Sequence, residues 1–267
     1  MGPRVQKLAM VLTLTLLLGG CGGSYVWGWY VLSPSLPRGQ SNLLFLLSGA
    51  GNTVAVALCA ITISVVLGLL IALPTLSGNR YARAFSRAYV EILRSVPMLV
   101  MVLWVYYGLP VVFNISPDVF TAGVIALALC DSAFEAEIFR AGIQSVDRGQ
   151  QEAADALGLN YIDKMRYIVL PQAIRRVLPP LGNQFVYMLK TSSLLSVIGL
   201  TELTRRANEL IVTEYRPLEI YSFLVLEYLA LIMVASWLVR RLERRMAAGD
   251  RQNQTRDKGA ATRKRGA

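Results

Sequence analysis

The sequence predicts an all-α membrane protein, and three observations point to that class. Of its 267 residues, 54% are hydrophobic and only 16% are charged, with a mean hydropathy of +0.47. Ordinary soluble domains carry about 25% charged residues, so this chain has too few to cover a soluble surface. The charges are also segregated, since residues 39 to 79 contain none. A soluble globular enzyme is therefore excluded.

Residues 49–244 are expected to form a transmembrane domain with five membrane-spanning helices, because a hydrocarbon core of about 30 Å needs a long apolar segment to cross it. The expected spans are Gly51–Leu73, Ser95–Phe113, a helix that starts near Val119, about Leu178–Leu200, and Glu219–Val239. Lysines and arginines concentrate at 80–94, at about 140–176 and in the C-terminal tail. By the positive-inside rule these parts face the cytoplasm, which places the N-terminus outside and the C-terminus in the cytoplasm.

The first 24 residues form a unit of their own. Arg4 and Lys7 precede a leucine-rich run that ends at Cys21. This pattern indicates either a secretory signal peptide with a lipobox, in which Cys21 is lipidated, or an uncleaved hydrophobic helix that continues past Trp27. A start codon assigned too early is the third alternative. Residues 25–48 are expected to form an extracytoplasmic linker, and residues 245–267 a basic, disordered cytoplasmic tail.

Residue types exclude most other chemistry. There is no histidine, and the three cysteines are too scattered to suggest a metal cluster or a disulfide framework. Lys190-Thr191-Ser192 resembles the end of a P-loop but lacks its glycines. We therefore expect no catalytic residues, no bound metal and no cofactor. Of the net charge of +10, +7 lies from Arg240 onward, which is typical of a cytoplasmic tail and does not indicate nucleic-acid binding.

The most informative segment lies within the expected cytoplasmic loop at about 140–176. Glu152-Ala153-Ala154 is followed by Gly158, and Ile168 by Leu170-Pro171. This order predicts a short alanine-rich helix, a glycine stop, an amphipathic segment and a proline break. Small residues would let another protein approach the backbone closely, although an ordinary helix lying on the membrane has the same composition.

This spacing resembles the EAA loop of ABC importer permeases, EAA-x3-G-x9-I-x-L-P, at every defined position. The flanking segments narrow the resemblance to the subfamily for polar amino acid uptake (histidine, glutamine, glutamate and arginine permeases). They are Leu93–Leu99, Glu137–Ile143, Pro171-Gln172-Ala173 and Leu189–Leu194. The resemblance covers about Gly51 to Arg244. It implies a five-helix core of the type I importer kind, in a bacterial inner membrane, that pairs with a second permease subunit around a central pathway.

The resemblance also implies the partners of the chain. A separate ATP-binding subunit would hydrolyse ATP, and an extracytoplasmic binding protein would deliver the amino acid. The EAA loop would dock into the ATP-binding subunit and move as a rigid lever. The implied coupling residues are Glu152, Ala153, Ala154, Gly158, Ile168, Leu170 and Pro171.

Charged residues near membrane depth are costly and therefore suggest function. Glu135, Lys190 and Glu227 are candidates for the pathway or a gate, and Asp131 lies one turn before Glu135. Asp131 and Glu135 could equally lie at the cytoplasmic end of the third span. The rival classes are an ion-coupled secondary transporter or channel, a membrane-embedded enzyme, and a permease-like regulatory protein that transports nothing. The first leaves the EAA spacing unexplained, and the second has no catalytic set.

Overall fold

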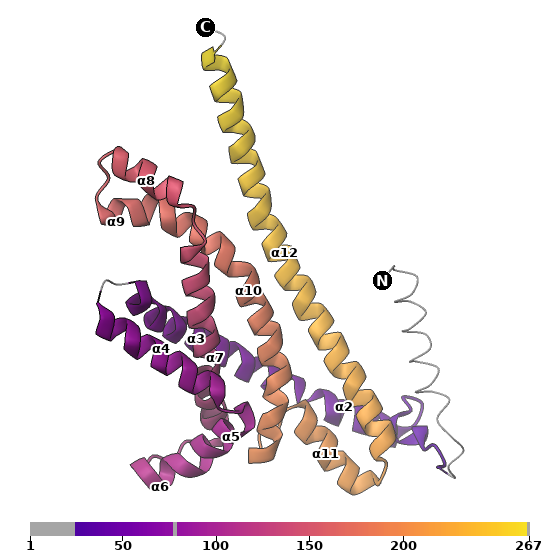
Figure 1. The fold of residues 1–267 in the computed structure, drawn as a ribbon. Helices are drawn as coiled ribbons and strands as arrows, with labels where there is room; N and C mark the ends of the chain where they lie inside the picture. Colours follow the sequence, from indigo (N-terminus) through magenta and orange to yellow (C-terminus); the bar gives the residue numbers. More distant parts are fainter. Residues whose placement is uncertain (1–24, 77–78, 266–267) are drawn as a thin grey trace.

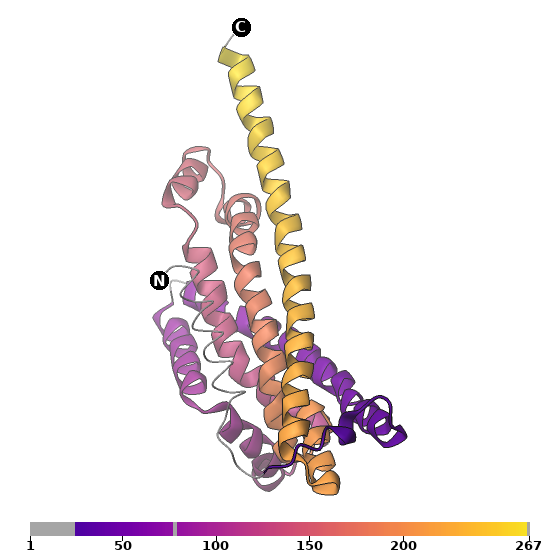
Figure 2. The same ribbon diagram turned by 90° about the vertical axis from the view of Figure 1, so that its right-hand side faces the viewer.

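The computed structural model describes residues 25–76 and 79–265, and every regular element within these ranges is a helix. The expected all-α class is therefore confirmed. The five longest helices (Figures 1 and 2) are α3 (Ala50–Ala72), α4 (Arg80–Ser95), α7 (Val119–Gln144), α10 (Leu170–Thr191) and α12 (Pro217–Arg265). The shorter α-helices are α2 (Pro37–Leu47), α5 (Met98–Leu103), α6 (Leu109–Phe113), α8 (Arg148–Ala156), α9 (Tyr161–Lys164) and α11 (Leu203–Glu214). Tighter 3₁₀ turns occur at Trp29–Leu32, Leu73–Leu76 and Ser192–Ile198, and wider π turns at Trp104–Gly108 and Met165–Val169.

The segment expected as a linker, residues 25–48, is helical over its second half. Pro37 opens α2, a position where its missing N–H costs no hydrogen bond. Leu46 is completely buried in an apolar cluster that also holds Leu203 of α11 and Ile220 of α12, and α2 packs on α11. The chain continues into α3 through Gly49, where a Cβ would lie 2.7 Å from the backbone of the α11 start. This part is therefore folded onto the bundle.

The second expected span, Ser95–Phe113, corresponds to the continuous segment Met98–Phe113, and a sharp bend separates it from α4. α4 and the segment Met98–Phe113 meet at an angle of 98°. Pro97 ends α4 because proline holds the residue before it in an extended conformation, and Val96 has φ −84° and ψ 124°. Pro110 follows the π turn. Proline has no backbone N–H to donate, and the wider spacing of the π turn accommodates the missing hydrogen bond.

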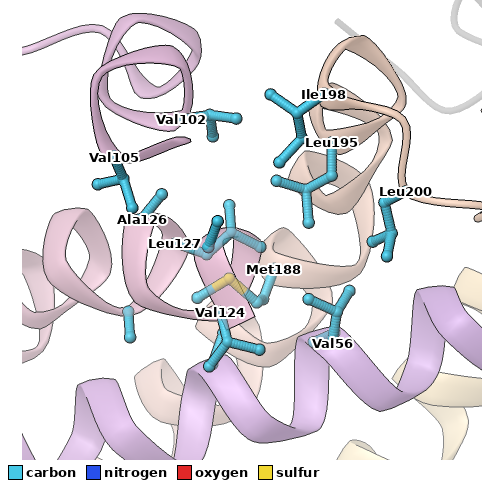
Figure 3. Close-up of a cluster of buried hydrophobic side chains, with 14 of the residues drawn as sticks. Val56, Val102, Val105, Val124, Ala126, Leu127, Met188, Leu195, Ile198 and Leu200 are labelled. Atoms are coloured by element: carbon cyan, nitrogen blue, oxygen red, sulfur yellow. The ribbon is translucent and has the colours of Figure 1, made fainter. Parts of the chain in front are cut away.

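A buried apolar cluster holds α3, α7 and α10 together (Figure 3). Val56 from α3, Leu127 from α7 and Met188 from α10 are completely buried in it. α3 and α7 approach closely, since a Cβ on Gly68 would lie 2.4 Å from the Cβ of Glu135. These three helices, packed on one another, form the frame of the bundle.

Fewer of the described helices are long and apolar enough to cross a membrane than the five spans expected. Pro37–Thr75, α7 and Pro217–Arg244 are long and apolar enough, and the bent α4–α6 pair makes a fourth. α10 is not apolar enough, because its arginines, prolines and amide side chains lower its mean hydropathy. It nevertheless packs against both α7 and α12, beside which it runs in both views.

The C-terminal tail also differs from its expectation. Of the residues 245–267 that were expected to be disordered, 245–265 are helical, since α12 continues to Arg265 and projects beyond the bundle (Figure 1). Alanine, arginine and glutamine favour helix even where no neighbouring element packs against them.

Candidate functional site

The segment between α7 and α10 forms a helical hairpin, which we call the α8–α9 hairpin (residues 147–169). It lies at one end of the bundle, as Figure 1 shows. Asp147 caps α8 by accepting a hydrogen bond of 2.8 Å from the Gly149 N–H. At the other end, the N–H groups of Gly158 and Leu159 donate to the carbonyls of Asp155 and Ala154 at 3.0 and 3.1 Å. This pair of bonds is the Schellman arrangement, and it closes α8.

Gly158 is a glycine for conformational reasons. Its φ is +75°, in the left-handed region, while a Cβ at this position would meet nothing within 4 Å. Left-handed backbone costs an L-residue about 1–2 kcal/mol. The predicted glycine stop is therefore confirmed, and its role is to turn the chain sharply between α8 and α9.

Polar and apolar contacts brace the hairpin internally and against the bundle. The Lys164 ammonium lies 2.7 Å from the Asp155 carboxylate and ties α9 to α8. Asn160 caps α9 by accepting from the Asp163 N–H at 2.9 Å. At the base, α7 and α10 are in direct contact, since a Cβ on Gly142 would lie 2.2 Å from the Val177 side chain. A small apolar cluster closes the base, made of Ile143, Val146, Val169 and Ala173.

The structure divides the predicted coupling residues into exposed and buried ones. Glu152, Ala153 and Gly158 are exposed at the surface of the hairpin. Ala154 is completely buried, so its small side chain serves packing within the hairpin rather than an outer surface. Ile168 is half-buried in the π turn that precedes Leu170.

Pro171 opens α10 and is exposed, and Leu170 beside it is 39% exposed. The π turn before Pro171 accommodates the hydrogen bond that proline cannot donate, as the π turn before Pro110 does. Sequence reasoning missed the large apolar side chains around Gly158. Leu157 is 79% and Ile162 is 72% exposed. Apolar residues in an otherwise polar segment, directly beside a helix stop, were the available signal.

Two acidic residues lie inside the bundle, one turn apart on α7. The Asp131 carboxylate accepts hydrogen bonds from the Ser64 hydroxyl on α3 at 2.8 Å and the Gln184 amide on α10 at 3.0 Å. Glu135 is completely buried, and neither carboxylate oxygen has a hydrogen-bond partner. Both acidic side chains are therefore buried inside the bundle, and α7 continues past them to Gln144.

The other two pathway candidates lie elsewhere. Glu227 on α12 is 9% exposed, and both of its carboxylate oxygens lack a partner. Lys190 is exposed and lines a cavity of about 400 Å³ between α10 and α12, together with Asn183 and Arg240. No hydrogen bond or ion pair among the described residues joins Glu135, Lys190 and Glu227.

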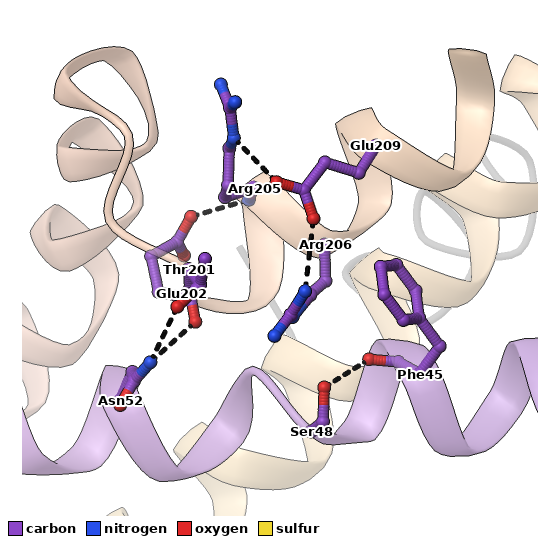
Figure 4. A network of polar contacts seen from close by, with 8 residues as sticks. All are labelled: Phe45, Ser48, Asn52, Thr201, Glu202, Arg205, Arg206 and Glu209. Atoms are coloured by element: carbon purple, nitrogen blue, oxygen red, sulfur yellow. Dashed lines mark hydrogen bonds and ion pairs between the residues drawn. The ribbon is translucent and has the colours of Figure 1, made fainter. Parts of the chain in front are cut away.

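Sequence reasoning also missed two completely buried glutamates, Glu202 and Glu219. Glu202 caps α11, accepting from the Arg205 N–H at 2.7 Å, the Thr204 N–H at 2.9 Å and the Tyr228 hydroxyl at 2.9 Å. Burial raises the pKa of the Glu202 carboxyl, and these hydrogen bonds oppose that effect. Figure 4 shows this junction, where Asn52 on α3 also donates to Thr201.

Glu219, at the start of α12, accepts from the Tyr25 hydroxyl and the Gly28 N–H, and so holds the start of the described chain. Its partners lie more than 190 residues away in sequence, which is why no local pattern indicated them.

Apolar helices in a bundle, buried charges between them and an exposed hairpin at one end define a membrane transport permease. The profile of the family described as "Binding-protein-dependent transport system inner membrane component" matches residues 64–248. The chain belongs to this family, and it is the inner-membrane permease component of an ABC transport system.

Individual relatives agree with this assignment. The glutamine transport system permease protein GlnP of Escherichia coli K12 is 38% identical over 219 residues, which cover 82% of this chain and 97% of the relative. The arginine transport system permease protein ArtQ of Bacillus subtilis is 32% identical over 206 residues, 77% of this chain and 94% of the relative.

Solved structures share the fold. A crystal structure of an amino acid ABC transporter with histidines matches with a TM-score of 0.75 and 39% identity, over 83% of this chain and all of that chain. The inward-facing MetNI methionine ABC transporter matches with a TM-score of 0.66 at 18% identity, over 78% of this chain and 98% of that chain, which shows a common fold.

Proposed function

We propose that this chain is the transmembrane subunit of an ATP-driven importer for polar amino acids. Relatives named for glutamine and arginine transport support this substrate class. The chain would form half of the translocation pathway with a second permease subunit, identical or different. A separate ATP-binding subunit would hydrolyse ATP, and an extracytoplasmic binding protein would deliver the amino acid.

The observation that carries the proposal is the construction of the α8–α9 hairpin. Its exposed tip carries Glu152, Ala153 and Gly158 beside the apolar side chains of Leu157 and Ile162. Exposed apolar side chains grouped on a polar segment are typical of a protein interface. The hairpin would bind the ATP-binding subunit at this tip. Because its base is packed between α7 and α10, a push at the tip would move those helices as rigid bodies.

We assign the hairpin and the C-terminus to the cytoplasm. The positive-inside rule supports this orientation because the segment 140–176 and the tail are both basic. Both also lie toward the same end of the molecule in Figure 1.

Glu135 and Glu227 remain our candidates for the pathway, since a buried carboxylate without a partner is costly in a membrane helix. Lys190 is assigned to a gate, because its charge lies in a cavity between two helices. Cys21, the candidate lipidation site, lies outside the described residues.

The test is uptake by proteoliposomes that hold the complex, with radiolabelled glutamine or arginine. Glu152→Lys should abolish both ATP-driven uptake and co-purification of the ATP-binding subunit. Glu152 has no intrachain ion pair among the described residues, so the fold should survive the change. Gln150→Lys is the matched control, because Gln150 is exposed on the same helix about 200° away.

Equal effects of Glu152→Lys and Gln150→Lys would contradict the coupling assignment. Uptake by the wild-type chain that needs an ion gradient but no ATP would favour a secondary transporter instead.

A further inference from the structure

A basic cleft lies between α4 and the last turns of α7, close to the start of α8. It encloses about 450 Å³. Three arginines of α4 line it, and Arg140 faces them from α7. The arginines of α4 are Arg83, Arg87 and Arg94. Glu91 and Glu137 are the acidic residues in the lining, so the cleft has a formal net charge of +2.

Two of these arginines have no hydrogen-bond or ion-pair partner in the part of the chain that the structure describes. Glu137 is occupied by Arg140, with the closest atoms 2.6 Å apart, and Arg94 lies over the Phe134 ring at 5.1 Å. Arg83 and Arg87 form no ion pair or hydrogen bond with any described residue. A guanidinium group presents a planar fork of donors that matches a phosphate group. The cleft therefore has the charge and the donors to hold an anion of this shape.

The opposite side of α4 is apolar and exposed. Tyr81, Phe85 and Ile92 follow one another at spacings of four and seven residues, and each is at least 63% exposed. Arg83, Arg87 and Arg94 repeat the same spacing two residues later, roughly 200° round the helix. Ser86 and Val90, between these two faces, are buried and attach α4 to the bundle.

This arrangement is typical of a helix that lies in the plane of a membrane surface. The 98° angle between α4 and Met98–Phe113 fits such an orientation, because the following segment can then enter the bilayer. The apolar face would meet the acyl chains, and the arginines would lie at the level of the phosphates.

We propose that the basic cleft binds the phosphate of an anionic membrane lipid, held by Arg83 and Arg87. A lipid accounts for both faces of α4, whereas a free phosphate would account only for the arginines. Because Arg140 and Gln144 of the lining lie in the last two turns of α7, the bound headgroup would also steady the base of the α8–α9 hairpin.

The test is native mass spectrometry of the purified full chain, titrated with phosphatidylglycerol or phosphatidylcholine in detergent. We expect selective retention of phosphatidylglycerol. The double variant Arg83→Gln/Arg87→Gln should lower the affinity for phosphatidylglycerol about 25-fold, because each arginine at an anionic lipid surface contributes a factor of about five. Arg80→Gln is the matched control, because Arg80 is exposed on the same helix, stacks on Tyr81 and does not line the cleft. Elution volume and thermal transition in phosphatidylcholine should stay unchanged in all variants.

Three results would overturn the proposal. The first is equal retention of the two lipids, or an equal loss in the double variant and the control. The second is displacement of phosphatidylglycerol by glycerol phosphate at the same concentration as the lipid, which would indicate a site for a free phosphate. The third is unchanged lipid retention combined with loss of the ATP-binding subunit from the double variant, which would make the cleft a protein docking surface.

Discussion

Replacing Gly68 by alanine tests the close contact of α3 and α7. The added Cβ would lie 2.4 Å from the Cβ of Glu135, and 3.0 Å from the Ala136 nitrogen and the Ser132 carbonyl oxygen. These atoms belong to the backbone or are attached directly to it, so a side-chain rotation cannot remove the clash. The two helices would have to separate by about 1 Å to reach van der Waals distance. Overpacking of this kind costs about 1–3 kcal/mol.

Gly51→Ala is the control, since Gly51 lies in the same helix and a Cβ there meets nothing within 4 Å. Both changes also gain helix propensity, less at Gly51 in the first turn of α3 than at Gly68, so the difference between the variants is a lower bound on the steric cost. Thermal unfolding of the purified chain in detergent should place Gly68→Ala below Gly51→Ala by about 2–12 °C, at about 2–4 °C per kcal/mol. Equal transition temperatures would refute the close approach of the two helices.

Three further sites give testable expectations. Glu202→Ala removes the cap of α11 and should lower the free energy of unfolding by about 2 kcal/mol, measured by thermal unfolding. Glu202→Gln retains an acceptor and should lower it less. Equal losses of stability in the two variants would attribute the effect to charge alone. Gly158→Ala should speed amide hydrogen exchange at the end of α8 by about 5- to 30-fold through left-handed strain of about 1–2 kcal/mol, and unchanged exchange would contradict that strain. Burial acts to raise the pKa of the Glu214 carboxyl, but hydrogen bonds from Arg38 and Asn42 outweigh it and lower that pKa below its ordinary value of 4.5. The stability from the Arg38–Glu214 pair is therefore present above pH 4.5 and lost as the pH falls through the lowered pKa. Arg38→Gln should lower the melting temperature at pH 7, and its difference from wild type should vanish in acid. A difference that stays constant with pH would contradict this reasoning.

The sequence was sufficient where a feature depends on nearby residues. The helix–glycine–helix order of the α8–α9 hairpin follows from Gly158 and its neighbours, because a Schellman turn needs only one left-handed residue at a helix end. The apolar segment Gly51–Leu73, which ends at Pro74, likewise predicted α3 almost to the residue. Local composition decides such features, so no knowledge of the fold was needed.

Features that depend on distant contacts were missed. α2 appeared to be part of a linker because the residues that bury Leu46 lie on α11 and α12. The role of Glu219 depends on Tyr25 and Gly28, at the other end of the described chain. The burial of Asp131 and Glu135 follows from the approach of α3 through Gly68, and a hydropathy profile of α7 does not contain that information.

α7 and α10 connect the α8–α9 hairpin to the buried acidic residues. α7 and α10 leave the base of the hairpin in contact at Gly142 and Val177, and meet again deeper in the bundle, where Gln184 donates to Asp131. Two contacts along the same pair of helices resist their sliding past each other. A displacement at the proposed ATP-binding-subunit contact would therefore be passed along α7 and α10 toward Asp131. Asp131 also accepts from Ser64 on α3, so the movement would load the Ser64–Asp131 bond and the Gly68–Glu135 contact, where α7 meets the third helix of the frame.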